Sequence, residues 1–378
     1  MRVLLSVHHP LNRNAGAQGA TLALGDSLCE LGCKVEFLSF DRVFPAHRYT
    51  AAEPLRYPWS VASRLARIAK DFNVIDASSG DAWLWATLAR PGATKQLALI
   101  TRSHGLEHAV DRLLRDSARR GASRLRRRYR LYHGGFRLWE VRRSFQLADM
   151  SIFVNDEDAA FAVESFHLDE RRVRVIANGI APSFLRVADV LDGLAGPVRL
   201  AFVGGWTERK GNAALVEAVD SLVRDGIDFQ LLLAGTGLGP EKLLPCFSAA
   251  ARPRIEVRPQ YENSALPALL ADREIVLFLS RAEGFGLTLI EAMACGLAPV
   301  ATPVGVAPAA IRPEENGYFV QVDAGAQVAA AIKELSSDRE RLLRLRRAAQ
   351  RSAREYDWSR VGRATLLAYR DALASKLR

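Results

Sequence analysis

Residues 275–296 read IVLFLSRAEGFGLTLIEAMACG, and this stretch decides the fold class. Its first five residues form an apolar run of strand length, a glycine-rich loop follows, and a helical pattern then extends to the last glycine. A buried strand that leads through a short loop into a helix is the unit from which parallel sheets are built. The stretch therefore predicts a parallel α/β fold with polar groups at the carboxyl end of a strand.

Short apolar runs of the same kind alternate with helical patterns along the chain and fall into two series. The first series comprises residues 3–7, 35–40, 74–77, 97–101, 152–154 and 173–176, and the second comprises residues 199–203, 229–234, 255–257, 275–279 and 299–301. Such runs suit strands that are buried on both faces. We therefore expect two doubly wound parallel-sheet domains, whose ligands bind beyond the carboxyl ends of the strands.

A stretch without clear periodicity separates the two series. Residues 181–197 contain two prolines and two glycines, a composition typical of an interdomain linker. The sequence therefore predicts an N-terminal domain over residues 1–180, a C-terminal domain over residues 198–358 and a final helix over residues 359–378.

Charge is concentrated in one segment of an otherwise ordinary chain. The 378 residues carry 52 basic and 42 acidic side chains, a formal net charge of +10, and 49% of them are hydrophobic. This composition excludes a disordered chain, and no apolar run is long enough to span a membrane. Residues 102–143 contain 13 arginines and four acids, so this segment holds nearly all of the excess charge.

The 102–143 segment has two interpretations. Its arginines are interleaved with leucine and aromatic residues, which favours an amphipathic surface that docks on anionic lipid headgroups or on an anionic acceptor. The alternative is an arginine-rich helical hairpin exposed only to solvent. Four scattered cysteines indicate a reduced, cytoplasmic protein, which the first interpretation would place at the inner face of the cell membrane.

Loops after two strands of the second series carry groups suited to phosphate. Residues 204–211 read GGWTERKG, in which Arg209 and Lys210 offer a guanidinium fork and a point charge to a diphosphate. Gly204 and Gly205 would allow close approach of the backbone, and Gly235 follows the next strand in the same way. The alternative for the first loop is an ordinary solvated turn.

The opening stretch places two carboxylates around the start of a helix. Glu283 would lie in the loop and Glu291 about one turn into the helix, where each can bind a pair of sugar hydroxyls. The free N–H groups of residues 286–288 can hold phosphate oxygens. Alternatively, Glu291 pairs within the helix and Glu283 is a surface acid.

The N-terminal domain offers further candidates. Gly16 and Gly19 would let backbone N–H groups approach an anion, or they belong to an ordinary strand-to-helix loop. His104, at a strand end, could bind a hydroxyl or phosphate or transfer a proton, or it is a structural histidine. Residues 156–158, Asp-Glu-Asp, open a helix, so we expect them to cap it rather than bind a metal.

These motifs together resemble the retaining glycosyltransferases of family 4. The resemblance rests on the E-x7-E pattern of Glu283 and Glu291, on the 204–211 loop, and on Asn-Gly pairs at 178–179 and 316–317. It implies the GT-B fold, in which two Rossmann-like domains face each other across a cleft and the last helix packs back on the first domain. One departure is that many members have Gly-Arg where this chain has two glycines, which leaves Arg209 and Lys210 as the main cations.

The resemblance also implies roles for individual residues. Glu283 would hold hydroxyls of the donor sugar and stabilise charge at its anomeric carbon, Glu291 would hold the ribose, and His104 would face the transferred sugar. The implied catalytic residues are His104, Arg209, Lys210 and Glu283. The implied donor-binding residues are Gly16, Gly19, Gly204, Gly205, Arg209, Lys210, Gly235, Tyr261, Glu283, Gly284, Phe285, Gly286, Leu287, Thr288 and Glu291.

The activity that the resemblance implies is transfer of a hexosyl unit from a nucleoside diphosphate sugar to an acceptor hydroxyl, with retention of anomeric configuration. UDP-hexose and GDP-mannose are both open as donors, and the acceptor would be a glycan, a lipid-linked molecule or a small molecule. No metal or other cofactor is expected. A nucleotide-sugar epimerase or hydrolase on the same fold remains an alternative, whereas a nucleic-acid-binding protein has no use for the two-carboxylate motif.

Overall fold

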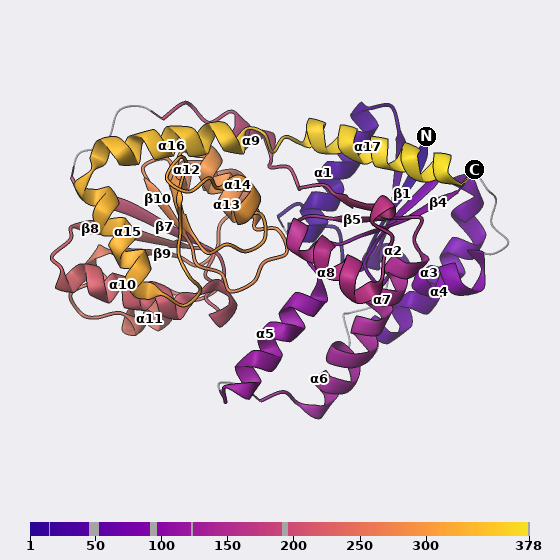
Figure 1. Cartoon of the computed structure of the whole chain (residues 1–378), viewed down its shortest axis with the longest axis horizontal. Helices are drawn as coiled ribbons and strands as arrows, with labels where there is room; N and C mark the ends of the chain where they lie inside the picture. Colours follow the sequence, from indigo (N-terminus) through magenta and orange to yellow (C-terminus); the bar gives the residue numbers. More distant parts are fainter. Residues whose placement is uncertain (15, 45–52, 91–96, 122–123, 191–195, 377–378) are drawn as a thin grey trace. The chain divides into compact units, whose positions relative to one another are not determined.

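The computed structural model describes all residues except 15, 45–52, 91–96, 122–123, 191–195 and 377–378, and it leaves out the side chains of 53–55. The chain forms two compact units (Figure 1). The N-terminal unit consists of Met1–Gly179 and Trp358–Arg378, and the C-terminal unit consists of Ile180–Asp357. Each unit is described by itself.

A six-stranded parallel sheet organises the N-terminal unit, with the strand order β2-β1-β3-β4-β5-β6. Its strands are β1 (Arg2–Val7), β2 (Lys34–Ser39), β3 (Val74–Ser78), β4 (Ala98–Arg102), β5 (Met150–Phe153) and β6 (Val173–Val175). Its α-helices are α1 (Gly16–Glu30), α2 (Phe40–Val43), α3 (Glu53–Ile68), α4 (Trp83–Leu88), α5 (Glu107–Arg119), α6 (Arg127–Leu131), α7 (Leu138–Leu147), α8 (Asp156–Phe166) and α17 (Trp358–Ser375).

Helices cover both faces of this sheet, which explains the unbroken apolar runs. Successive side chains of a strand point to opposite faces. Val3 and Leu5 of β1 therefore pack in one cluster with residues of α1 and α17, while Leu4 packs in another with residues of α3 and α4. All three are at most 2% exposed.

The last helix packs on the N-terminal unit and hydrogen-bonds a buried ion pair of its sheet. In the core, Arg102 of β4 donates from Nε and Nη2 to Asp76 Oδ2 of β3, at 3.0 and 2.7 Å. The hydroxyl of Tyr369 in α17 donates to the same oxygen at 2.6 Å, and Tyr369 itself is fully buried. A helix that follows the entire C-terminal unit in sequence thus completes the core of the N-terminal unit.

A second six-stranded parallel sheet organises the C-terminal unit, with the order β12-β11-β10-β7-β8-β9. Its strands are β7 (Val198–Val203), β8 (Phe229–Ala234), β9 (Ile255–Arg258), β10 (Ile275–Phe278), β11 (Ala298–Ala301) and β12 (Tyr318–Phe319). Its α-helices are α9 (Pro182–Leu185), α10 (Asn212–Arg224), α11 (Pro240–Leu243), α12 (Leu266–Leu270), α13 (Leu287–Ala294), α14 (Ala307–Ala310), α15 (Gly325–Ser337) and α16 (Arg339–Ala353).

Two doubly wound parallel sheets confirm the predicted fold class. The stretch at 275–296 forms β10, a loop and α13, as its pattern predicts. The segment predicted as a linker, 181–197, differs in detail, since the unit boundary lies at Gly179–Ile180 and α9 carries the buried Phe184. No helix of the described residues is both long and apolar enough to cross a membrane.

Candidate functional site

A loop after β7 brings two cations to the carboxyl edge of the C-terminal sheet. A 3-10 turn over Glu208–Lys210 carries Arg209 and Lys210, and Gly211 follows as the N-cap of α10. Gly211 has a φ of +76°, and a Cβ atom there would lie 2.0 Å from the carbonyl oxygen of Leu279. Glycine therefore lets this loop pack against the residue that follows β10, beside the loop that leads into α13.

Glu283 accepts hydrogen bonds from both cations. Its Oε1 accepts from Lys210 Nζ at 2.6 Å and from Ser280 Oγ at 2.7 Å, and its Oε2 accepts from Arg209 Nη1 at 3.1 Å. The side chains of Glu283 and Lys210 are 8% and 14% exposed, whereas that of Arg209 is 39% exposed. Arg209 therefore has the most solvent-accessible charge of the three.

The two cations keep Glu283 ionised. Burial favours the neutral carboxylic acid, but the charges of Lys210 and Arg209 outweigh it and hold the pKa of Glu283 below its ordinary value. Lys210 is also oriented by Phe278, whose ring centroid lies 5.9 Å from Nζ. Arg209, Lys210 and Glu283 together carry one net positive charge.

The N-terminus of α13 begins in the same loop as Glu283. Gly286 caps the helix with a φ of +96°, and a Cβ atom there would lie 2.7 Å from Phe278 Cζ. Leu287 is the first helical residue, and the buried Oγ1 of Thr288 has no hydrogen-bond partner among the described residues. Free N–H groups in the first turn of a helix attract anions, so this turn adds to the positive potential near Arg209 and Lys210.

The side chain of Phe285 packs inside the unit and stabilises the loop, so it is not exposed to a ligand. Its ring is buried and lies 6.2 Å from that of Tyr356, centroid to centroid. Its carbonyl oxygen accepts the N–H of Val306 at 2.7 Å. The loop at Gly284–Gly286 is thereby held against the body of the unit, and the predicted contact of Phe285 with a donor would involve its backbone.

A second cluster lies around Glu291 of α13. The glutamate is 6% exposed, and its Oε1 accepts a hydrogen bond from Asn263 Nδ2 at 3.0 Å. Burial raises the pKa of Glu291 to about 6, and the Asn263 hydrogen bond only partly offsets this. Burial and the nearby Glu291 charge also raise the pKa of Tyr261, and a Cβ atom on Gly235 would lie 2.8 Å from the Tyr261 ring. The structure thus brings Gly235, Tyr261 and Glu291 together.

In the N-terminal unit, His104 meets the first turns of α1. Its Nε2 lies 3.3 Å from Thr21 Oγ1, and a Cβ atom on Gly19 would lie 2.6 Å from the carbonyl oxygen of Arg13. Gly16, by contrast, begins α1 with open space around it. Burial and the charge of Arg102 lower the pKa of His104 to about 3, so its imidazole is neutral near neutral pH.

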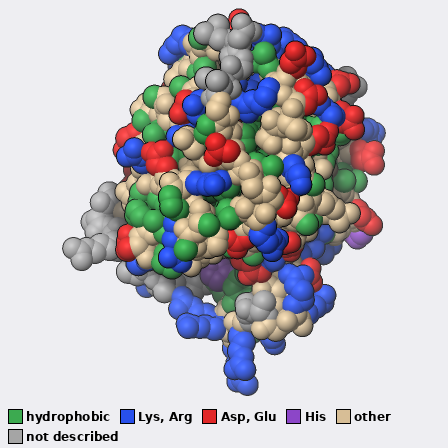
Figure 2. All heavy atoms as spheres, turned by 90° about the vertical axis from the view of Figure 1, so that its left-hand side faces the viewer, with side chains coloured by type: hydrophobic (Ala, Val, Ile, Leu, Met, Phe, Trp, Pro, Cys, Tyr) green, Lys and Arg blue, Asp and Glu red, His purple; other side chains and the backbone are tan. Residues whose placement is uncertain are grey.

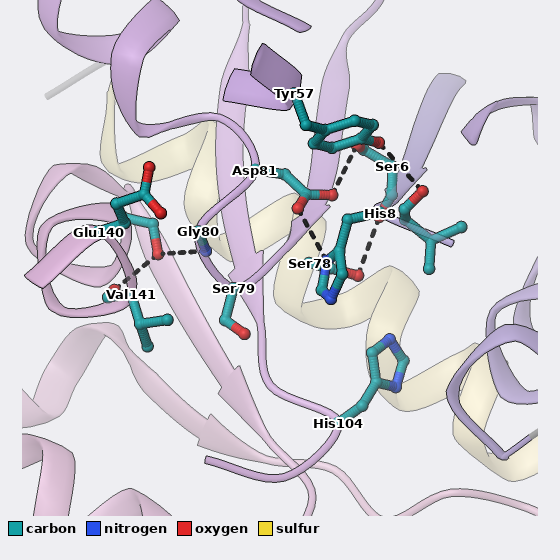
Figure 3. A network of polar contacts seen from close by, with 12 residues as sticks. Ser6, His8, Tyr57, Ser78, Ser79, Gly80, Asp81, His104, Glu140 and Val141 are labelled. Atoms are coloured by element: carbon teal, nitrogen blue, oxygen red, sulfur yellow. Dashed lines mark hydrogen bonds and ion pairs between the residues drawn. The ribbon is translucent and has the colours of Figure 1, made fainter. Parts of the chain in front are cut away.

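A polar network lies at the ends of β1 and β3, where Figure 3 shows it with His104 nearby. Asp81, which has no exposed surface, accepts hydrogen bonds from Ser6 Oγ at 3.0 Å and from His8 Nδ1 at 2.9 Å. The Ser78 hydroxyl donates to the Ser6 carbonyl oxygen at 3.0 Å. The His8 side chain is 29% exposed, so this pair joins a buried carboxylate to a ring that reaches solvent.

A second set of charged groups borders that network. Arg137 donates to Glu107 at 3.1 Å and to the carbonyl oxygen of Ser79 at 2.9 Å. The buried Glu140 accepts from Trp83 Nε1 at 3.0 Å, and burial raises its pKa to about 7. The carboxyl edge of the N-terminal sheet is therefore lined by polar side chains that could bind sugar hydroxyls.

Residues 156–158 open α8. The N-cap Asn155 accepts the N–H of Asp158 at 2.7 Å, and the buried Asp158 accepts the N–H of Leu106 at 2.8 Å. The part of the chain that the structure describes contains no cluster of three or more metal-binding side chains.

The predicted residues thus fall into three groups. Arg209, Lys210 and Glu283 are in direct contact, Gly235 and Tyr261 lie beside Glu291, and Gly16, Gly19 and His104 belong to the other unit. Sequence reasoning missed Ser280 and Asn263, which hydrogen-bond the two glutamates, and Asp81. Ser280 adjoins the two-carboxylate motif, whereas no motif marks Asn263 or Asp81.

Two family models match consecutive parts of the chain. The model described as Glycosyltransferase Family 4 matches residues 15–184, and the model described as Glycosyl transferases group 1 matches residues 194–352. The chain belongs to glycosyltransferase family 4. Its resemblance to this family is therefore confirmed.

Curated relatives of this family 4 chain match it over part of their length. It is 26% identical over 237 residues to D-inositol 3-phosphate glycosyltransferase of Segniliparus rotundus, covering 60% of this chain and 53% of that protein. It is 28% identical over 268 residues to α-maltose-1-phosphate synthase of Mycolicibacterium smegmatis, covering 64% and 68%. The match thus spans about half the length of the inositol phosphate relative.

A solved structure resembles the family 4 chain over its full length. Sucrose-phosphate synthase from Thermosynechococcus elongatus superposes with a TM-score of 0.77 at 19% identity, covering 99% of both chains. At this identity the likeness shows the fold, and it confirms the predicted two-domain GT-B architecture.

Proposed function

We propose that this chain is a retaining glycosyltransferase that transfers a hexosyl unit from a nucleoside diphosphate sugar to an acceptor hydroxyl. Family membership supports the class of reaction. The observation that carries the donor assignment is the contact of Glu283 with Lys210 and Arg209, beside the N-terminus of α13. The donor would bind the C-terminal unit, and the acceptor would bind the N-terminal unit.

The proposed reaction needs positive charge at the leaving group and negative charge at the sugar. The bond between the anomeric carbon and the diphosphate oxygen breaks, and the acceptor oxygen attacks the same face and gives its proton to the departing diphosphate. Arg209, Lys210 and the first turn of α13 stabilise the charge on the diphosphate. Glu283, which these cations keep ionised, holds sugar hydroxyls and stabilises positive charge at the anomeric carbon.

The Glu291 cluster suits the nucleoside. A carboxylate in a largely buried site accepts hydrogen bonds from two ribose hydroxyls with good geometry, and the ring of Tyr261 lies close to it. Asn263, which already donates to Glu291, fixes the orientation of the carboxylate. These groups do not discriminate uracil from guanine, so both donor classes are included in the test.

The relatives favour a small phosphorylated acceptor over a glycan or a lipid-linked molecule. The names of the three similar proteins each contain a phosphorylated sugar or polyol: inositol 3-phosphate, maltose-1-phosphate and sucrose-phosphate. We therefore propose inositol phosphates and hexose phosphates as the first acceptors to test. His104, which is neutral near pH 7, would contribute a hydrogen bond there rather than a charge.

A thermal-shift screen with UDP-sugars and GDP-sugars identifies the donor, because a ligand stabilises the folded state by mass action. Product analysis with that donor, with and without acceptors, then separates the candidate activities. Transfer requires a new glycoside that forms only with acceptor. Free sugar or an epimerised donor formed equally fast without acceptor would instead identify a hydrolase or an epimerase.

Replacing the central carboxylate tests the mechanism. We expect Glu283→Gln to lower kcat by roughly 100-fold or more, the range seen when one preorganised electrostatic group is removed. The matched control is Glu274→Gln, since the Glu274 side chain is 1% exposed, against 8% for Glu283, and is paired with Arg339 but lies outside the site. The control should lower stability and leave kcat/KM of the folded enzyme unchanged. Equal kcat values for wild type and Glu283→Gln would contradict the mechanism.

A further inference from the structure

The arginine-rich segment forms a helical hairpin in the N-terminal unit. We define the arginine hairpin as residues 107–121 and 124–137, which include α5, α6 and a π-helical segment over Tyr132–Arg137. In Figure 1, α5 and α6 extend away from the sheet as two arms joined at their far end. The described connection and α6 contain no buried residue, so this end contributes nothing to the core.

Polar contacts hold the two arms together. Arg115 of α5 pairs with Asp111 on the same helix and donates to the carbonyl oxygen of Gly134 at 2.8 Å. The Tyr129 hydroxyl of α6 donates to Asp111 at 3.1 Å. These contacts use one arginine and one acid, and the arginines between residues 119 and 130 remain exposed.

The far end of the hairpin carries charge that no carboxylate neutralises. Seven arginines between residues 119 and 130 are exposed, and Arg119 has a carboxylate partner, Asp116, at 3.4 Å. The other six have no ion-pair partner among the described residues: Arg120, Arg124, Arg126, Arg127, Arg128 and Arg130. In Figure 2, Lys and Arg side chains dominate the lowest part of the surface, where the hairpin lies. Mutual repulsion of these charges is relieved by an anionic partner.

Exposed large apolar side chains follow these arginines along the chain. Leu131, at the end of α6, is 77% exposed, and Phe136 and Trp139 are 44% and 47% exposed. The Phe136 and Trp139 rings stack with centroids 5.6 Å apart. Exposed leucine, phenylalanine and tryptophan beside basic residues are typical of surfaces that insert shallowly into the interface of a lipid bilayer.

We propose that the arginine hairpin docks this protein on the surface of an anionic membrane. The arginines contact lipid headgroups, and Leu131 with the Phe136–Trp139 pair enters the boundary between headgroups and acyl chains. A soluble polyanion would satisfy the arginines but leave the exposed Leu131 without an apolar partner. The proposal is independent of the glycosyltransferase reaction, because membrane binding is measured without donor or acceptor.

Vesicle sedimentation of the full-length protein tests the proposal. We expect binding to mixed phosphatidylcholine–phosphatidylglycerol vesicles, little binding to phosphatidylcholine alone, and weakening as the Debye length falls from about 10 Å at 0.1 M salt to about 3 Å at 1 M. Each basic residue near such a surface contributes roughly fivefold in binding. Arg126→Gln with Arg127→Gln and Arg130→Gln should therefore reduce the partition coefficient by roughly 100-fold.

A charge-matched control and an apolar variant complete the test. Arg64→Gln with Arg224→Gln and Arg344→Gln removes three exposed arginines outside the hairpin and should leave binding within about twofold of wild type. Leu131→Ser should reduce vesicle binding several-fold without changing the circular dichroism spectrum. Equal binding to neutral vesicles, or equal losses in both triple variants, would overturn the proposal. Duplex DNA binding that falls in the hairpin triple variant, with vesicle binding unaffected by Leu131→Ser, would overturn it in favour of a nucleic acid partner.

Discussion

Burial of Glu291 links stability to the donor binding that we propose for it. Its pKa rises from 4.5 to about 6 on folding, so between these pH values the folded state holds more protons than the unfolded state. The free energy of unfolding therefore falls as the pH rises through this range, and above pH 6 the full cost applies. A shift of this size corresponds to about 2 kcal/mol. The protein thus keeps a destabilising carboxylate in the position where a ribose would bind.

Glu291→Gln should remove that cost. Near pH 7 we expect the variant to be more stable than wild type by about 2 kcal/mol, with the difference growing between pH 4.5 and 6 and then remaining constant. The glutamine can still accept the Asn263 hydrogen bond. Donor binding should weaken by roughly 10- to 100-fold, because hydrogen bonds to a charged acceptor are lost.

Urea unfolding across this pH range and donor titration by calorimetry measure the two effects. A variant that is less stable than wild type at pH 7 would show that the buried carboxylate is stabilised by contacts other than the Asn263 hydrogen bond. Undiminished donor affinity would remove Glu291 from the donor site.

Individual site residues were predictable from the sequence where a side chain of suitable chemistry stands within a recognisable local motif. Arg209, Lys210 and Glu283 lie in short loops directly after apolar runs, so the sequence itself places them at one edge of a sheet. Asn263 follows β9, an edge strand whose residues are mostly half-buried, and contacts Glu291 only through tertiary packing. Asp81 is likewise unmarked, since its burial depends on Ser6 and His8, more than 70 positions earlier in the chain.

At the level of elements, close packing of glycine backbones positions the site. Gly211 contacts the end of β10, and Gly286 contacts Phe278 at the end of the same strand. Both have positive φ angles, so each combines a conformation that disfavours a side chain with a space that excludes one. The loop at 208–211 and the start of α13 therefore both pack against the end of β10.

Gly286→Ala should lower stability by more than the strain of a positive φ angle alone would. The variant is strained by its φ of +96° and by a contact of 2.7 Å with Phe278 Cζ, and we expect a loss of about 2–4 kcal/mol in stability. Gly226→Ala is the control, because Gly226 has a φ of +68° and no atom within 4 Å of its would-be Cβ. It should lose only about 1 kcal/mol.

Chemical denaturation of both variants, together with donor thermal shifts, measures the difference. We expect donor binding to weaken in Gly286→Ala and to persist in Gly226→Ala. Similar losses of stability in the two variants would mean that the Phe278 contact relaxes without consequence for α13.

The elements themselves were largely predictable because most strands are buried on both faces and read as unbroken apolar runs. The exceptions are short or depend on tertiary contacts. β12 has two residues and pairs only with β11, so it leaves no periodic signal. The proline-rich and glycine-rich 181–197 segment predicts a linker, yet Pro182 begins α9 in the first-turn position that proline favours, and Phe184 is buried.

The whole chain is joined by contacts that no local pattern reveals. Tyr369 and Asp76 are 293 residues apart in sequence, and their hydrogen bond completes the buried Asp76–Arg102 pair. An aspartate within the apolar run of β3 is unfavourable when the strand is considered alone, because its carboxylate is buried. Its set of partners is complete only when α17, which follows the entire C-terminal unit in sequence, packs on the sheet. Completion of the N-terminal core thus requires the last helix of the chain.

Tyr369→Phe tests how strongly α17 supports the N-terminal unit. Removing the hydroxyl leaves Asp76 with Arg102 as its remaining partner, and loss of a buried hydrogen bond to a charged group should cost about 1.5–3 kcal/mol. Tyr356→Phe is the control in the C-terminal unit, because the Tyr356 hydroxyl makes no hydrogen bond among the described contacts.

Because a chain with two units need not unfold in one step, hydrogen exchange resolved by segment is the suitable measurement. Protection should fall in β3, β4 and α17 of Tyr369→Phe and remain at wild-type levels in the C-terminal sheet. Unchanged protection in β3 and β4 would show that the Asp76–Arg102 pair is self-sufficient, and α17 would then act through its apolar packing on α1 and the sheet.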